Sequence, residues 1–176
     1  MNTLFTDIKC CEFTFLINCQ GHHFLESYFV DTGLLMSLAF DIGVLSMPEA
    51  YSAFTRGKLL INEGMLFENV TAQLLRSSGK ELHYVEFQAK ENDKNVHEIV
   101  FILPRGKNIL PVEVKSGDRT TSKSLAKFRK TYSPRSSIRL SSKNFGREDD
   151  LYSIPLYAAF CIDKGWADKV GEDRTE

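Results

Sequence analysis

The chain has 176 residues and a formal net charge of −1 at pH 7. Apolar residues make up 43% of it and charged residues 26%, which is ordinary for a globular domain and argues against a disordered chain or a uniformly basic nucleic-acid-binding protein. No apolar run is long enough to span a membrane, and charged residues interrupt residues 1–21, where a secretory signal would be continuously apolar. We therefore expect one cytoplasmic domain with no membrane partner.

The N-terminal part of the sequence contains most of the cysteines. The four cysteines are Cys10, Cys11, Cys19 and Cys161. The first three lie near His22 and His23, which raises the alternative of a zinc site, but their spacing lacks the Cys-x2-Cys unit that presents two thiolates to one tetrahedral ion. We favour reduced thiols on a strand, since four cysteines are too few for a disulfide framework in a chain of this length.

Residues 1–27 are expected to form an N-terminal extension, in which Phe13–Ile17 favours a short strand. Tyr28–Val30 is then extended, and Asp31 or Thr32 is placed to cap a helix that ends near residues 41–43. The residues expected to face inward from this helix are Leu34, Leu35, Leu38 and Ala39.

Gly64–Ser78 shows the clearest helical pattern of the chain. Its apolar residues recur at spacings of three and four: Leu66, Phe67, Val70, Leu74 and Leu75. Gly79 stands where a glycine commonly ends a helix.

The second half of the chain changes to a strand pattern. The expected elements are strands at Leu82–Phe87, Val96–Leu103 and Ile109–Lys115, a hairpin turn at Pro104–Asn108, a helix at Ser122–Tyr132 capped by Ser122, and a strand at Ser137–Ser142. Parallel pairing of the last two strands would make the helix a βαβ crossover. The sequence thus predicts an α/β fold with a mixed central sheet flanked by helices, over residues 28–162, followed by a flexible charged tail at 163–176.

Positive charge is concentrated in one segment. Between Lys115 and Arg147 the cations are Lys115, Arg119, Lys123, Lys127, Arg129, Lys130, Arg135, Arg139, Lys143 and Arg147, ten against the single acid Asp118, a local charge of +9. The segment is either a solvated helix face or a surface that attracts phosphate. In the second case Arg119, Lys123, Lys127 and Lys130 would contact nucleic acid.

The motif most informative about chemistry is Pro111–Gly117, with the sequence PVEVKSG. On a strand, Glu113 and Lys115 point to one face, while Val112 and Val114 point to the core. In metal-dependent phosphodiester cleavage a carboxylate binds the divalent ion, and a lysine stabilises the attacking water or the charge on the phosphate.

Several stretches together resemble a known family. They are Phe29–Leu35, Leu66–Asn69, Glu98–Ile102, Pro111–Gly117 and, as a last strand, Ile154–Tyr157. Their order is similar to that in the C-terminal domain of unknown function of prokaryotic AAA-type ATP-binding proteins, which looks like a PD-(D/E)xK restriction-endonuclease fold. The resemblance implies Glu68, Glu113 and Lys115 as catalytic residues. Val100 stands where the family usually has an aspartate that shares Mg²⁺ with Glu68 and Glu113, and Glu98 is the candidate replacement.

Three functional hypotheses follow. The first is a nuclease-like module with a degenerate site that contacts DNA or protein. The second is an active Mg²⁺-dependent nuclease that uses Glu68, Glu98, Glu113 and Lys115, and the third is a structural homo-oligomerisation domain. The sequence lacks the G-x-x-x-x-G-K-[ST] phosphate loop, so an ATPase partner would be a separate domain.

Overall fold

The computed structural model describes residues 8–10, 12–14, 27–41, 46, 48–49, 51–52, 56, 63–88, 96–116 and 121–162. In these residues, seven strands form one mixed sheet in the order β1-β4-β5-β6-β7-β9-β8. The strands are β1 (Ile8–Cys10), β4 (His83–Phe87), β5 (His97–Arg105), β6 (Asn108–Val114), β7 (Ser137–Ser141), β8 (Gly146–Glu148) and β9 (Leu151–Pro155). The tail at 163–176 lies outside the described residues.

The sheet combines an antiparallel half with a parallel one. β1, β4, β5 and β6 pair antiparallel, β6, β7 and β9 pair parallel, and β8 pairs antiparallel with β9 at the edge. Helix α4 (Lys123–Tyr132) connects β6 to β7 as the predicted crossover. The mixed α/β sheet flanked by helices is therefore confirmed.

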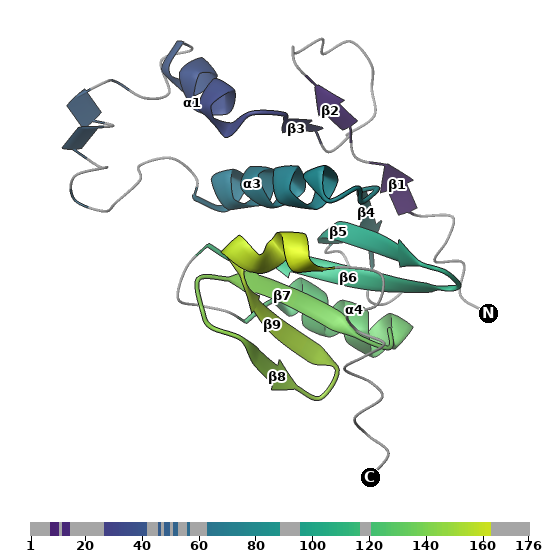
Figure 1. The fold of residues 1–176 in the computed structure, drawn as a ribbon. Helices are drawn as coiled ribbons and strands as arrows, with labels where there is room; N and C mark the ends of the chain where they lie inside the picture. Colours follow the sequence, from purple (N-terminus) through teal and green to yellow (C-terminus); the bar gives the residue numbers. More distant parts are fainter. Residues whose placement is uncertain are drawn as a thin grey trace.

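Two layers cover the sheet. Helix α3 (Glu63–Ser77) and the 3-10 helix η2 (Leu156–Cys161) pack against one face, while α4 lies behind the sheet in Figure 1. Helix α1 (Thr32–Asp41) contacts α3 and β3 (Ser27–Phe29), and β3 pairs parallel with β2 (Glu12–Thr14). None of the helices in the described residues has the length and apolar character that crossing a membrane requires.

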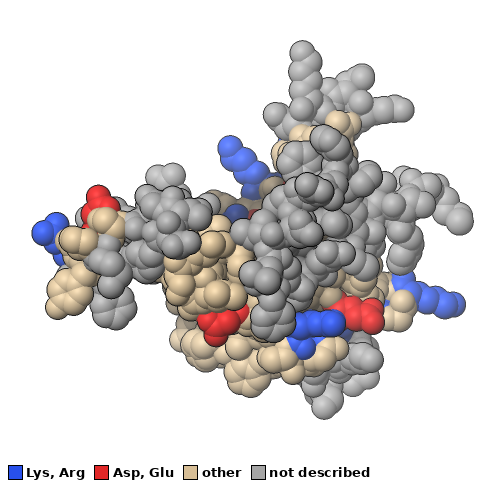
Figure 2. All heavy atoms as spheres, turned by 90° about the horizontal axis from the view of Figure 1, so that it is seen from above, with Lys and Arg blue, Asp and Glu red and all other residues tan. Residues whose placement is uncertain are grey.

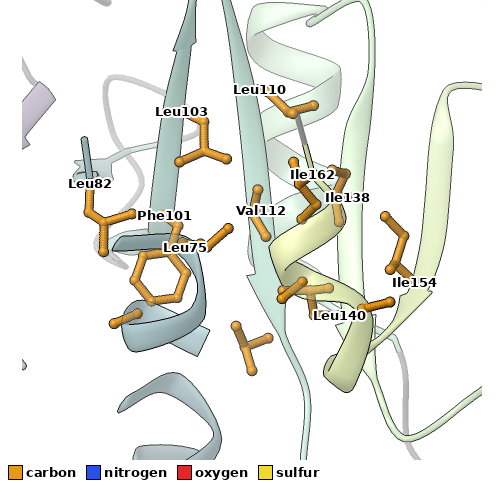
Figure 3. Close-up of a cluster of buried hydrophobic side chains, with 14 of the residues drawn as sticks. Leu75, Leu82, Phe101, Leu103, Leu110, Val112, Ile138, Leu140, Ile154 and Ile162 are labelled. Atoms are coloured by element: carbon orange, nitrogen blue, oxygen red, sulfur yellow. The ribbon is translucent and has the colours of Figure 1, made fainter. Parts of the chain in front are cut away.

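The larger core lies between the sheet and α3. Leu75 of α3 packs with Phe101 and Val112 of the central strands and with Ile138 and Leu140 of β7, all fully buried (Figure 3). Burying a side chain of this size contributes about 1.5–3 kcal/mol. This cluster therefore fixes the central strands and, with them, the direction in which β6 presents its polar residues.

The core on the α4 side is smaller and rich in aromatic rings. Phe128 of α4 meets Phe87 of β4 edge to face, with ring centroids 5.3 Å apart, and Tyr132 lies 4.7 Å from Phe128. Leu125 and Phe128 are the buried residues of the helix, as predicted for its apolar contacts.

The predicted helix ends are confirmed by hydrogen bonds. Asp31 accepts from the amide of Leu34 (2.8 Å), and Ser122 Oγ accepts from the amide of Leu125 (3.0 Å). Gly79 follows α3 with φ of 77°, a left-handed conformation that glycine adopts without steric cost.

Other expectations need correction. Leu34 is 40% exposed rather than inward-facing, since the main contacts of α1 in the described residues are with α3 and β3. The last strand ends at Pro155, not Tyr157: proline has no amide hydrogen to continue the ladder, and the chain turns into η2. The first predicted strand is seen only as β2, since residues 15–17 lie outside the described range.

Candidate functional site

Glu113 lies near the end of β6, where the strand pairs with β7. Its neighbours Val112 and Val114 are buried in the core on the α3 side, so the strand alternation turns Glu113 toward α4. Only 5% of Glu113 is exposed. The predicted alternation along this motif is confirmed.

The carboxylate of Glu113 is held by two partners. Oε1 lies 2.7 Å from Nζ of Lys115, whose side chain is one-third exposed, and accepts a 2.9 Å hydrogen bond from Oγ of Ser122. The other oxygen, Oε2, is buried and has no hydrogen-bond partner in the described part of the chain. A buried carboxylate oxygen without a partner is costly, and such atoms occur where a ligand or water is bound.

Ser122 has two roles at this position. Its hydroxyl group caps α4 and also donates to Glu113, so the start of the helix is tied to the carboxylate. The sequence predicted the cap and missed the second contact, because that contact depends on where the crossover places the helix.

Arg139 is the second residue that sequence reasoning missed. It is in register with Glu113 on the neighbouring strand β7, and its Nη2 donates to Oγ of Ser153 on β9 (2.7 Å). The alternation of polar and apolar residues in Ser137–Ser141, SIRLS, was the available signal. A polar row thus crosses three parallel strands on the α4 side of the sheet.

Val100 lies on β5, which is the neighbour of β6 on the side away from β7. The last paired residues of β5 and β6 are Phe101 and Val112, so Val100 and Glu113 are the next residues along the two strands. Val100 is half-buried and packs against the core on the α3 side, whereas Glu113 faces α4. A valine at this position offers no oxygen ligand.

The other predicted acids are distributed over different elements. Glu98 is half-buried on β5, where it is in register with Glu86 of the neighbouring strand β4. Glu68 is half-buried on α3, the helix that covers the opposite sheet face from α4. Among the described residues, no three His, Cys, Asp or Glu side chains gather closely enough to hold one metal ion.

These donors do not fit a Mg²⁺ site shared by two carboxylates. Mg²⁺ prefers six oxygen ligands and is usually held by one or two carboxylates plus water and substrate phosphate. Within the described residues, the polar group around Glu113 offers one uncommitted carboxylate oxygen, because Oε1 already binds Lys115 and Ser122.

The predicted nucleic-acid-binding lysines lie along one side of α4. Lys123, Lys127 and Lys130 are spaced at i, i+4 and i+7, which aligns them on one stripe of a helix. Lys123 and Lys130 are exposed, whereas Nζ of Lys127 lies 2.6 Å from Nε2 of His97. Arg119 lies outside the described residues.

A shallow groove of about 420 Å³ opens at the C-terminal end of α4. Its lining residues are Arg129, Lys130, Ser133, Pro134, Arg135 and Asp150. Three cations against one acid make this groove positive. By contrast, the face in Figure 2 shows acidic and basic side chains scattered among uncharged ones, so the described positive charge does not gather there.

The zinc alternative has no support from the described residues. The side chains of Cys10, Cys11, Cys19, His22 and His23 all lie outside them, and Cys161 is an exposed free thiol on η2.

One family model matches the chain. The family is described as Domain of unknown function (DUF4143), and its model matches residues 63–158, more than half of the sequence. No curated protein and no solved structure matches the chain. The matched range includes α3, the strands from β4 to β9 and the group around Glu113.

Proposed function

Because the chain belongs to the family described as Domain of unknown function (DUF4143), we propose the function that the geometry around Glu113 supports best: a cytoplasmic nuclease-like domain that contacts nucleic acid but has too few metal ligands to hydrolyse it. The observation on which this rests is the buried Glu113 carboxylate, paired with Lys115 at 2.7 Å beside a helix rich in cations.

The geometry supports the nuclease-like part of the proposal. A carboxylate and a lysine on one strand face, at the end of a parallel strand pair, are the groups that phosphodiester cleavage uses. Val100 in place of a second carboxylate, and Glu68 on the helix of the opposite face, argue against retained hydrolysis.

The contact with nucleic acid is assigned to α4. Its lysine stripe begins next to Ser122, which binds Glu113, and ends at Lys130, which lines the cationic groove. The two helix caps, Ser122 and Ser133, are about 16 Å apart along the helix axis. A row of cations of this length favours a phosphate backbone, which carries regularly spaced negative charge.

The resemblance to the C-terminal domain of AAA-type proteins extends the proposal. It supports a role beside an ATPase domain, which would supply any ATP hydrolysis because this sequence has no phosphate loop.

The proposal is tested by binding and cleavage of a labelled DNA duplex. Fluorescence anisotropy at several NaCl concentrations should show an affinity that falls with salt. In a Lys123→Ala/Lys127→Ala/Lys130→Ala variant, the slope of log K against log salt should fall by about 0.9 for each lysine that contacts a phosphate. Lys107→Ala, in the exposed β5–β6 turn, is the matched control and should bind like the wild type.

The same duplex should stay intact with Mg²⁺ or Mn²⁺. Cleavage that disappears in Glu113→Ala would contradict the incomplete site and favour an active nuclease. Absence of DNA binding, with a mass that rises with concentration, would favour the oligomerisation domain instead.

A further inference from the structure

The connection between β7 and β8 exposes an aromatic residue among polar ones. Residues 142–145 are all exposed, and 60% of Phe145 is accessible. Burying a phenylalanine side chain stabilises a fold by about 1.5–3 kcal/mol, and the exposed Phe145 does not make this contribution. Exposed aromatic residues also occur on η2, at Tyr157 and Phe160, so exposure alone does not define a site.

Charge distinguishes Phe145 from the aromatic residues of η2. Lys143 precedes it by two residues and Arg147 follows it by two, and no acid lies between residues 142 and 147. The acids Glu148 and Asp149 follow at the far end of β8. An aromatic ring between two cations matches a nucleic-acid strand, in which bases alternate with phosphates.

The connection lies at the functional end of the sheet. β6, β7 and β9 are parallel, so their C-terminal ends lie at the same edge of the sheet. The amide of Lys115, just after β6, donates to the carbonyl of Leu140 near the end of β7 (2.8 Å). The connection to β8 starts directly after Ser141. Phe145 directly precedes β8, and three strand spacings, about 14 Å, separate β8 from β6, so Phe145 and the Glu113 site lie within reach of one bound strand.

Local hydrogen bonds hold this connection in place. The amide of Lys143 donates to Oγ of Ser141 (3.2 Å), and the amide of Phe145 donates to Oδ1 of Asn144 (2.9 Å). Arg147 is placed by a bond from Nε to the carbonyl of Asp149 (3.1 Å) and lies 5.0 Å above the Tyr152 ring. A backbone fixed in this way orders a contact residue at a lower entropic cost on binding.

We infer that Phe145 stacks on an unpaired base of a nucleic-acid strand, with Lys143 contacting a neighbouring phosphate. The inference rests on the proposed function and adds to the α4 contact a second contact, which is specific for single-stranded nucleic acid. An unpaired base is required because an exposed aromatic ring reaches base faces only where the bases are unstacked.

The test compares a fluorescein-labelled oligo(dT) strand with a hairpin duplex, by anisotropy. Phe145→Ala should weaken binding of oligo(dT) by at least about fivefold, the lower range for loss of one stacked base, and leave the duplex affinity unchanged. Phe160→Ala removes an exposed aromatic residue from η2 and should bind both probes like the wild type. In a Phe145→Trp/Trp166→Phe chain, oligo(dT) should quench the new tryptophan.

The outcomes separate the two proposals. Equal oligo(dT) affinities of Phe145→Ala and Phe160→Ala, or an unquenched tryptophan, would overturn the stacking inference and leave the α4 contact standing if the duplex still binds. Loss of oligo(dT) binding in Phe145→Ala, with no effect of the three lysine substitutions, would support stacking and remove the role of α4. A wild-type chain that binds neither probe would end both.

Discussion

At the scale of single residues, the site depends on one carboxylate whose two oxygens differ. Oε1 of Glu113 is committed to Lys115 and Ser122, while Oε2 is buried without a partner in the described part of the chain. Val100 is the next residue along β5 from the pair Phe101–Val112, but its side chain packs against the core on the α3 side, whereas Glu113 faces α4. The shortage of metal ligands therefore involves several positions, namely the valine at 100 and the location of Glu68 and Glu98 on other elements.

The resemblance predicts that Val100→Asp raises the affinity for Mn²⁺ measured by calorimetry, because aspartate restores the hard oxygen ligand that the family usually has at this position. The substitution should also lower stability without metal, since an unpaired carboxylate at a half-buried position is costly. Val96→Asp, at a 60% exposed position just before β5, is the control and should change neither quantity. An unchanged Mn²⁺ affinity in Val100→Asp would argue against this description of the site.

At the scale of elements, the long segments were predictable because their own sequences specify them. α3 shows its buried residues at helical spacing and ends at Gly79, and the β5–β6 hairpin turns at Gly106–Lys107, where Gly106 has a φ of 59°. β8 was missed because all three of its residues are exposed, so no apolar alternation marks it. The bond between Ser122 and Glu113 was missed for a different reason: it joins two elements, and neither contains its signal alone.

Ser122→Ala should lower the free energy of unfolding by about 1 kcal/mol through loss of the cap, and further through loss of a donor to the buried Glu113 carboxylate. Urea unfolding would measure it. Ser124→Ala, two residues into the same helix, is the matched control and should cost little. Ser122→Thr should restore most of the loss, because threonine also caps helices. Equal stabilities of Ser122→Ala and Ser124→Ala would exclude the dual role.

At the scale of the whole molecule, the sheet separates two environments. The α3 side is a continuous apolar core, whereas the α4 side combines an aromatic cluster with the polar row of Glu113, Arg139 and Ser153. The sequence predicted the mixed sheet and the Glu113–Lys115 pair, which depend on local alternation. The resemblance placed Glu68 beside Glu113 at one Mg²⁺ ion, which the sequence pattern could not check because helix acids and strand acids share no periodicity. In the structure Glu68 is on α3, which covers the sheet face opposite α4.

Phe101→Ala should destabilise the fold by about 3–5 kcal/mol, because its ring is fully buried at the centre of the sheet and packs 5.4 Å from the ring of Tyr28. Thermal unfolding followed by circular dichroism would measure the change. Tyr157→Ala removes a ring that is 71% exposed and should shift stability by less than about 0.5 kcal/mol. Similar losses in the two variants would contradict the location of the core.

Both margins of the sheet in the described residues are formed by strands of three residues, β1 and β8. A strand of three residues offers few unpaired backbone N–H and C=O groups with which a strand of another chain could pair. Arg147 and Glu148 also place charged side chains on the edge strand β8. Self-association, where it occurs, is accordingly expected to proceed through side-chain contacts rather than by joining sheets, and fibril-like growth from these margins is disfavoured.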